Sequence, residues 1–262
     1  AYYPYTSPEA FESPESPSNT GLTPNLLSNG KGLPSFDLEV KNTPENQVDI
    51  LISDLITDLP QSRDTEGDPG TPFNDLSIYD KVKFVFHHAL AKIEFRVVAD
   101  TEIRKDLVKF KLKSLGITNI YNNGTLNVGY DAGNTTLNWS GQSTTHNYSF
   151  KTYEPQLLMP QSISDLTTLN LDYEITFKSD GTSYEYLGDG SLRPLDDYTY
   201  KNEASIQLNT MKKNGTNEAL TAWEANHHYI YTIRLRANRI EFTGQVVDWG
   251  DEDEIEDIPI EE

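Results

Sequence analysis

The stretch KVKFVFHHALAKIEFRVV, residues 81–98, decides the fold of this chain. Its apolar residues occupy alternate positions, first Val82, Phe84, Phe86 and Leu90, then Ile93, Phe95 and Val97. Alternation is typical of a β-strand with one buried face, because successive side chains point to opposite sides. The two sets differ in parity, so we expect a bulge or bend near Ala89–Ala91, where one extra residue exchanges the faces. The stretch therefore opens the main β domain.

A helix is the competing interpretation of the same residues. Phe86, Leu90, Ile93 and Val97 also fit a period of 3.6 residues. The flanking residues are β-branched or aromatic, which favours the strand.

Period-2 patterns continue through the rest of the chain. Apolar residues alternate with charged or polar ones over 108–113, 126–130, 171–178 and 229–235, and further strands are expected at 184–187, 204–208 and 240–249. Asn122-Asn123-Gly124 and Asp180-Gly181 are strong hairpin signals. Since no helix of three turns is convincing, the sequence predicts an all-β fold, an antiparallel β-sandwich of Greek-key type.

The first part of the chain has a different composition. Residues 1–77 hold 10 of the 14 prolines, and proline cannot donate to a β-ladder. Only 35–40 and 48–56 are credible strands there, and 60–75 is typical of a linker. We therefore expect a partial N-terminal β-domain with its linker over 1–77, a C-terminal β-sandwich over 78–250, and an acidic tail over 251–262.

Charge is concentrated at the two ends. Of the net charge of −20, residues 1–77 carry 13 acids and 3 bases, and 251–262 carry 8 acids and no base. Acidic surfaces repel phosphate, so neither nucleic acid nor an anionic membrane is an expected partner. No apolar run is long enough to span a membrane. The opening Ala-Tyr-Tyr-Pro-Tyr resembles the interior of a longer chain, and we expect residues upstream of it.

Nothing in the sequence indicates an enzyme, a cofactor or a metal. There is no cysteine, nucleophile elbow, phosphate loop or dinucleotide fingerprint. Adjacent strand residues face opposite ways, so neither His87-His88 nor His227-His228 chelates a metal by itself. The run Asp251–Glu254 lacks the glycine and the late glutamate of a calcium loop. We predict no catalytic residue, no cofactor and no metal ligand.

A set of aromatic residues favours one other function. Tyr2, Tyr3, Tyr5, Trp139 and Tyr184 are candidates for a sugar-stacking platform, which would make the chain a surface glycan-binding module. Scattered aromatic residues in a β protein more often belong to the core or to an interface.

Four segments, in this order, carry a family resemblance. They are Phe86–Ile93, Leu158–Gln161, Trp223–Ile233 and Ile240–Trp249. Together they resemble the fimbrillins, the type V pilins and fimbrillin-like surface proteins of anaerobic Gram-negative bacteria.

The resemblance implies several expectations that the residue pattern does not give. Fimbrillins have two transthyretin-like β-sandwiches in tandem, are exported to the outer-membrane surface as lipoproteins, and lose an N-terminal segment by proteolysis. Their subunits polymerise when a strand fills a groove in a neighbour. The resemblance thus implies a non-enzymatic fimbrial subunit or accessory component that binds other subunits and a surface ligand. Residues 1–77 are too short and too rich in proline for a whole N-terminal sandwich, so we expect either that half of this domain is missing from the chain or that this member has a reduced one.

The acidic tail contains three isoleucines that a purely solubilising tail does not need. Ile258 and Ile260 share one parity and Ile255 lies on the other, with Pro259 tolerable only on an edge strand. We predict that Ile255, Ile258 and Ile260 contact a neighbouring subunit as a donor strand. The alternatives are an ordinary tail and an edge strand of the chain's own domain.

The apolar parity of each strand predicts the core. The expected buried residues are Phe84, Phe86, Phe95, Phe110, Leu112, Tyr173, Ile175, Phe177, Ile233 and Leu235. Trp249 shares the parity of the polar residues Glu241 and Gln245 and not that of Phe242. It is therefore expected to cover a sheet end or an interface and not to lie in the core.

Overall fold

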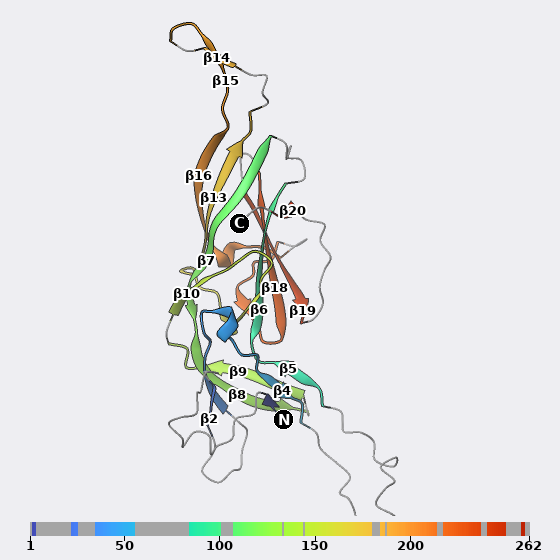
Figure 1. Ribbon diagram of the computed structural model, residues 1–262. Helices are drawn as coiled ribbons and strands as arrows, with labels where there is room; N and C mark the ends of the chain where they lie inside the picture. Colours follow the sequence, from blue (N-terminus) through green and yellow to red (C-terminus); the bar gives the residue numbers. More distant parts are fainter. Residues whose placement is uncertain are drawn as a thin grey trace, which may run out of the picture.

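Residues 84–98 fold as two strands with a bend between them in the computed structural model (Figure 1). β5 comprises Phe86–His88 and β6 comprises Ala91–Ala99, and the chain bends at Ala89 and Leu90. The predicted break in the alternation is confirmed, and so is the strand interpretation over the helix. Because β5 and β6 belong to different sheets, the bend carries the chain from one core to the other.

The structure describes most of the chain outside its two ends and a few loops. The described residues are 2–3, 22–25, 35–55, 84–100, 107–132, 134–143, 145–179, 184–186, 188–213, 217–236, 240–249 and 258–259.

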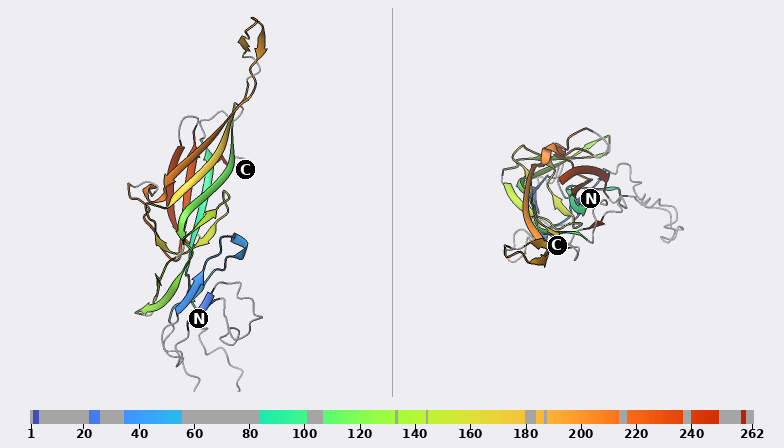
Figure 2. Two further views of the ribbon diagram at one scale, coloured as in Figure 1. Left: turned by 90° about the vertical axis from the view of Figure 1, so that its left-hand side faces the viewer. Right: turned by 90° about the horizontal axis from the view of Figure 1, so that it is seen from above.

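Two sheets pack face to face in the larger half of the molecule, as Figures 1 and 2 show. One has the order β10 (Thr145–Ser149), β7 (Val108–Tyr121), β13 (Thr168–Phe177), β16 (Tyr198–Gln207). The other has the order β11 (Gln156–Leu158), β6, β18 (His227–Leu235), β19 (Ile240–Asp248), with β20 (Ile258–Pro259) also paired to β6. The predicted β-sandwich is confirmed.

One strand pair departs from the antiparallel pattern. β6 and β18 run parallel, with His228 opposite Lys92 and Leu235 opposite Ala99. Parallel neighbours need a long crossover connection, and here the whole opposite sheet lies between the two strands in the sequence.

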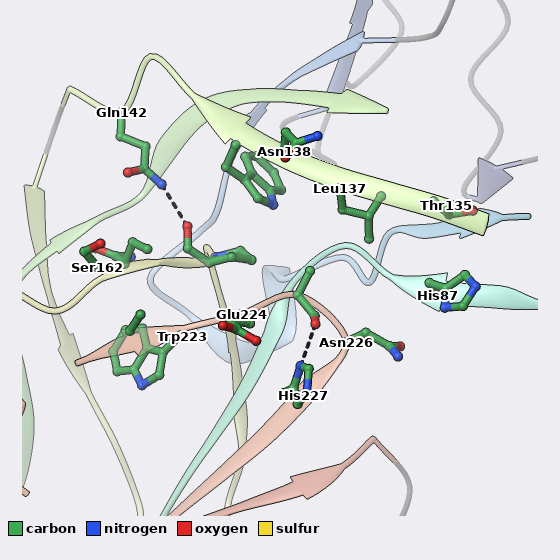
Figure 3. Close-up of a pocket in the computed structure, with 15 residues that line it drawn as sticks. His87, Thr135, Leu137, Asn138, Gln142, Ser162, Trp223, Glu224, Asn226 and His227 are labelled. Carbon is green, nitrogen blue, oxygen red and sulfur yellow. Dashed lines mark hydrogen bonds between the residues drawn. The ribbon is translucent and has the colours of Figure 1, made fainter. Parts of the chain in front are cut away.

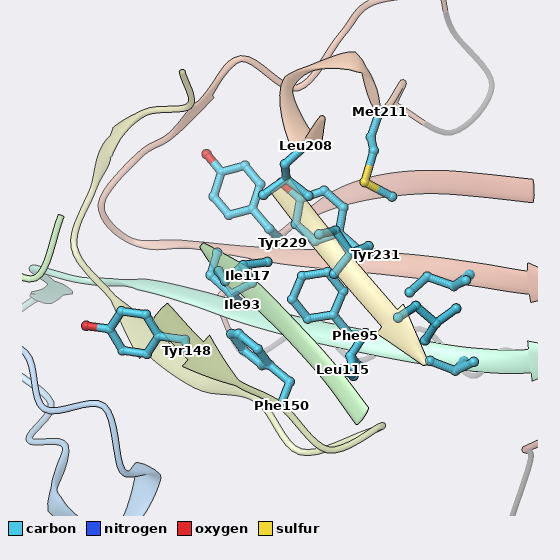
Figure 4. Packing of buried hydrophobic residues seen from close by; sticks show 14 of the residues in the cluster. Ile93, Phe95, Leu115, Ile117, Tyr148, Phe150, Leu208, Met211, Tyr229 and Tyr231 are labelled. Atoms are coloured by element: carbon cyan, nitrogen blue, oxygen red, sulfur yellow. The ribbon is translucent and has the colours of Figure 1, made fainter. Parts of the chain in front are cut away.

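Aromatic rings fill the centre of the sandwich (Figure 4). The Phe95 ring centroid lies 5.2 Å from that of Tyr231 and 4.8 Å from that of Phe150. The Tyr231 hydroxyl accepts a hydrogen bond from Trp223 Nε1 at 2.8 Å. Burial raises the pKa of Tyr231 far above its ordinary value, more than the Trp223 hydrogen bond lowers it. The polar tips of Trp223 and Tyr231 are therefore paired with each other inside the core.

Most of the predicted core residues are buried. The confirmed ones are Phe95, Phe110, Leu112, Tyr173, Ile175, Ile233 and Leu235, and Phe177 is partly buried against them. The prediction is wrong for Phe84 and Phe86, which are 46% and 42% exposed. These two residues lie before the bend, where β5 is in a separate small sheet, so the sandwich core does not cover their apolar parity.

We expect Phe86→Ala to change the free energy of unfolding by no more than about 0.5 kcal/mol, because the side chain is largely exposed. Chemical denaturation of the purified variant measures this. A loss of several kcal/mol would show that the ring is buried in solution.

A second, smaller core lies at the other end of the molecule (Figure 1). One of its sheets has the order β2 (Leu22–Asn25), β3 (Ser35–Glu39), β8 (Asn123–Asp131), β9 (Asn134–Ser140). The other has the order β1 (Tyr2–Tyr3), β4 (Leu51–Ser53), β5. Phe36, Leu38, Ile50, Ile52, Leu90 and Leu126 are among its buried residues. The strand predicted over 48–56 is thus present but shorter.

The hairpin predicted at Asn122-Asn123-Gly124 is wrong. β7 ends at Tyr121 and β8 begins at Asn123, and the two strands pair in different sheets. Gly124 does not adopt the positive φ that such a turn needs. Instead the Asn122 carbonyl accepts a hydrogen bond from Val40 N at 2.6 Å, so the chain continues extended from one core into the other.

The predicted domain boundary between residues 77 and 78 lies outside the described residues. The small core combines β3 and β4 from before that boundary with β8 and β9 from after it. The division itself stays a prediction, as does that at 250 and 251.

The remaining elements are short. They are η2 (Pro44–Asn46), η3 (Leu208–Thr210), β12 (Gln161–Ser162), β17 (Ala222–Trp223), β14 (Tyr184–Tyr186) and β15 (Leu192–Pro194). β14 and β15 form a ribbon that projects beyond the sandwich, away from the small core (Figure 2). The helices found among the described residues are far too short to cross a membrane.

Candidate functional site

One edge of β6 pairs with several short segments instead of one long strand. β18 pairs along the whole of the other edge, whereas this edge carries β11 at Ala91–Ile93 and β20 at Val98–Ala99. Between them, Tyr153 N donates to the Phe95 carbonyl at 2.9 Å and Val97 N donates to Thr152 Oγ1 at 2.8 Å. We call this the β6 edge.

β20 is the only described part of the predicted tail. Ile258 lies opposite Ala99, and Pro259 lies opposite Val98, in antiparallel register within the same chain. Ile255 and Ile260 lie outside the described residues. Proline cannot donate a backbone hydrogen bond, which suits a strand at the margin of a sheet. The described pairing comprises two residues of the tail. That the isoleucines contact another subunit stays a prediction.

Several exposed apolar residues belong to elements at two opposite ends of the molecule; Figure 2 shows where these elements lie. The distal pole, beside β14–β15 and the start of β16, carries Leu192, Leu195, Tyr198 and Tyr200. The proximal pole, beside β4 and β5, carries Leu55, Phe84, Val85 and Phe86. Exposed apolar groups that gather in this way mark interaction surfaces more often than scattered ones do.

His87 belongs to a hydrogen-bonded cluster around Asp54. His87 Nε2 lies 2.8 Å from Asp54 Oδ1, and the backbone N–H and hydroxyl of Thr135 donate to the same oxygen at 2.9 and 2.8 Å. Burial alone raises the pKa of Asp54, but the Thr135 and His87 hydrogen bonds outweigh it and hold that pKa below its ordinary value. The cluster ties β5 to β9.

His88 makes a different set of contacts. Its Nδ1 lies 2.8 Å from Asp49 Oδ2, and its backbone N–H donates to Asn226 Oδ1 at 3.0 Å. The Trp249 ring stacks on the imidazole at 3.9 Å between centroids, so Trp249 packs the end of β19 against β5. In the described part of the chain, no three His, Cys, Asp or Glu side chains gather in a way that could hold a metal ion.

A buried ionic cluster lies on β6 and β18. Glu94 Oε1 is 2.6 Å from Arg96 Nε, and Glu94 Oε2 is 3.1 Å from His228 Nε2. All three residues are less than 9% exposed. Burial raises the pKa of Glu94, but hydrogen bonds from His228 and Arg96 outweigh it and lower that pKa overall. His228, one member of the His227-His228 pair, thus contacts a carboxylate here.

An open cleft of about 620 Å³ separates β9 from the turn between β17 and β18 (Figure 3). Thr135, Leu137 and Trp139 line it from β9, and Trp223, Glu224 and His227 line it from the facing turn. Gln142 closes one end, where its Nε2 donates to the Pro160 carbonyl at 2.8 Å.

A family model for fimbrillin-like proteins matches residues 1–249. The chain belongs to the fimbrillin-like family. No curated protein matches this fimbrillin-like chain.

Three solved structures are similar to this chain, and the first of them shows its fold. A fimbrial protein from Bacteroides vulgatus is 18% identical, with a TM-score of 0.52 over 95% of this chain and 76% of that one. A protein from Bacteroides uniformis is 19% identical, with a TM-score of 0.46 over 95% and 71%. The tip fimbrial protein Mfa3 from Porphyromonas gingivalis is 12% identical, with a TM-score of 0.34 over 87% and 70%.

Several features of this fimbrillin-like protein have no signal in the sequence. The β6 edge depends on pairings between strands that are far apart in the chain. The cleft combines His87 with three separate segments, 135–142, 160–162 and 222–227. Of the proposed aromatic platform, Trp139 lines the cleft, while the side chains of Tyr2, Tyr3, Tyr5 and Tyr184 lie outside the described residues.

Proposed function

We propose that this chain is a structural subunit or accessory component of a cell-surface fimbria and that it has no enzymatic role. Membership of the fimbrillin-like family supports the fimbrial role. The observation that carries the proposal furthest is the pairing of β20 with the β6 edge, because it joins the acidic tail to a strand of the sandwich.

Assembly proceeds by strand addition between subunits. An extended segment that pairs with a sheet edge satisfies backbone hydrogen bonds and buries alternate side chains at the same time. Ile255, Ile258 and Ile260 supply those side chains, and the β6 edge of a neighbour accepts them in place of its own tail. When two copies exchange an identical element, each copy forms with its neighbour the same contacts that it makes within a single chain. The exchange therefore costs little free energy.

The two apolar poles support a head-to-tail arrangement. The distal and proximal poles are different surfaces at opposite ends of an elongated molecule. A contact between two different surfaces of the same subunit generates an open filament when its rotation does not close into a ring. Burial of the distal pole against the proximal pole of the next subunit removes both from water.

The partners and location follow from the same role. The protein binds other fimbrial subunits, of its own kind or related, and the finished fimbria presents a surface ligand site. It resides at the outer-membrane surface in the fimbria and is exported as a lipoprotein precursor. The chain is divided into an N-terminal part over 1–77, whose strands β3 and β4 share the small core with β8 and β9, a part over 78–250 that holds the sandwich, and the tail.

Deletion of residues 250–262 is expected to leave a folded monomer that no longer polymerises, because the donor strand is removed. Electron microscopy and sedimentation of the purified protein measure assembly, and circular dichroism measures folding. A matched variant with Asp251, Glu252, Asp253 and Glu254 replaced by Asn or Gln keeps the isoleucines and is expected to assemble. Fimbriae as abundant from the truncated chain as from the full chain would refute the donor role.

A further inference from the structure

The cleft between the two cores has walls from separate parts of the fold. β9 belongs to the small core, whereas β17 and the turn before β18 belong to the sandwich side (Figure 3). Its volume of about 620 Å³ is in the range of small-molecule sites in proteins. The His88 backbone N–H, which donates to Asn226 Oδ1 at 3.0 Å, joins β5 of the small-core side to the turn before β18.

Polar side chains in this cleft are held in place and keep hydrogen-bonding capacity for a ligand. One N–H of the Gln142 amide is used on the Pro160 carbonyl, which leaves its second N–H and its oxygen. His227 Nδ1 lies 2.8 Å from the Ala225 carbonyl, which only accepts, so Nδ1 donates and Nε2 is left on the other side of the ring.

The turn opposite β9 adds an amide and a carboxylate. Asn226 Oδ1 accepts the His88 N–H at 3.0 Å, which fixes the amide and leaves its NH₂ group as a donor. The Glu224 backbone N–H donates to the Tyr229 hydroxyl at 2.8 Å, which anchors this residue while its side chain is exposed. The site therefore offers donors and acceptors in similar measure.

Trp139 supplies the apolar surface. Its Nε1 donates to the Ala89 carbonyl at 3.0 Å, which fixes the ring orientation, and the half-buried ring lines the cleft. An aromatic ring of this kind packs against apolar groups while its polar tip is satisfied elsewhere.

The chemistry of the lining selects the class of ligand. Neither lysine nor arginine is among the lining residues, so an anionic ligand has no cationic partner there. We propose that the cleft binds a neutral oligosaccharide. Sugar hydroxyls both donate and accept, which suits Gln142, Glu224 and Asn226, and the C–H face of a sugar ring packs on Trp139. This assignment goes beyond the fimbrial role.

Binding is tested on the full chain with cellotriose, maltotriose, mannotriose, chitotriose and N-acetyllactosamine, by calorimetry and by saturation-transfer NMR. We expect at least one of them to bind. Glu224→Ala removes a charged hydrogen-bond acceptor and is expected to weaken that affinity by about tenfold. Trp139→Phe reduces the stacking surface and is expected to weaken it by about threefold to tenfold.

Two matched variants serve as controls. Trp249→Phe and Glu203→Ala change the same residue types outside the cleft and are expected to leave the affinity unchanged. Thermal unfolding of each variant verifies the fold. The proposal is overturned if none of the five sugars binds, or if binding is as strong in Trp139→Phe and Glu224→Ala as in the parent chain.

A peptide strand is the competing occupant. Thr135 N–H points away from β8, toward Asp54, so by alternation the backbone groups of Leu137 and Trp139 also face the edge of β9 with which no described strand pairs. A synthetic peptide of residues 250–262 is therefore titrated alongside the sugars. If that peptide binds in a Trp139-dependent manner and displaces the sugar signal, the cleft is a strand acceptor and the oligosaccharide proposal is wrong.

Fimbria formation by Glu224→Ala is scored separately, so failure of assembly and failure of sugar binding are distinguishable.

Discussion

Glu94→Gln is expected to lower the free energy of unfolding by about 3–5 kcal/mol, because it leaves a buried arginine without its carboxylate. Arg96 is 8% exposed and its Nε lies 2.6 Å from Glu94 Oε1, while His228 is 1% exposed on the other carboxylate oxygen. A guanidinium stays charged in proteins, so the variant must bury that charge unpaired. Chemical denaturation at neutral pH measures the loss.

The exposed pair Lys151–Glu154 provides the matched control. Its side chains are 65% and 59% exposed at 3.3 Å, so Glu154→Gln is expected to cost no more than about 1 kcal/mol. Equal losses in the two variants would show that Glu94 is not buried with its partners in solution.

The same carboxyl predicts a pH dependence. The pKa of Glu94 is lower in the folded chain than the ordinary value of about 4.3, so its stabilisation is fully present above that value. As pH falls through the lower folded pKa, that stabilisation is lost. Asp54 acts in the same direction, since its pKa is also lowered. The parent chain is therefore expected to lose stability more steeply below pH 4 than Glu94→Gln does.

Phe95→Ala is expected to destabilise the chain by about 3–5 kcal/mol, since it opens a cavity at the centre of the sandwich. The ring is fully buried and contacts both Tyr231 and Phe150. Phe86→Ala is the matched control on the other side of the bend, where the side chain is 42% exposed. Denaturant midpoints of the two variants measure the difference, and similar midpoints would contradict the assigned burial.

Alternation along single strands accounts for what the sequence predicts well. Phe110, Ile175 and Ile233 each lie on the apolar parity of a long strand, and each is buried. The break at Ala89–Ala91 was visible because the parity changes there. These signals are local, so they need no knowledge of which strand pairs with which.

The errors arise where a partner strand or sheet decides the outcome. Phe86 has the right parity, but the sandwich core does not cover its face. Asn123-Gly124 has a turn composition, yet β7 and β8 pair with different neighbours and the chain stays extended. The β6 edge and the cleft depend on such long-range pairings as well, which is why neither was predicted.

The most direct measurement of strand addition is a disulfide between two copies. The chain has no cysteine, and directly opposite residues of an antiparallel pair have Cα atoms about 4.5–5.5 Å apart, within disulfide reach. Ala99→Cys and Ile258→Cys are prepared as separate proteins with different tags, mixed, assembled and oxidised. Leu166→Cys, 72% exposed and remote from β6 in the described pairings, replaces Ala99→Cys as the control.

Strand addition predicts a mixed disulfide between the two tagged chains in assembled material, and none with the Leu166→Cys control. Fimbriae that form without the mixed disulfide, while a chain carrying both Ala99→Cys and Ile258→Cys links only to itself, would contradict it.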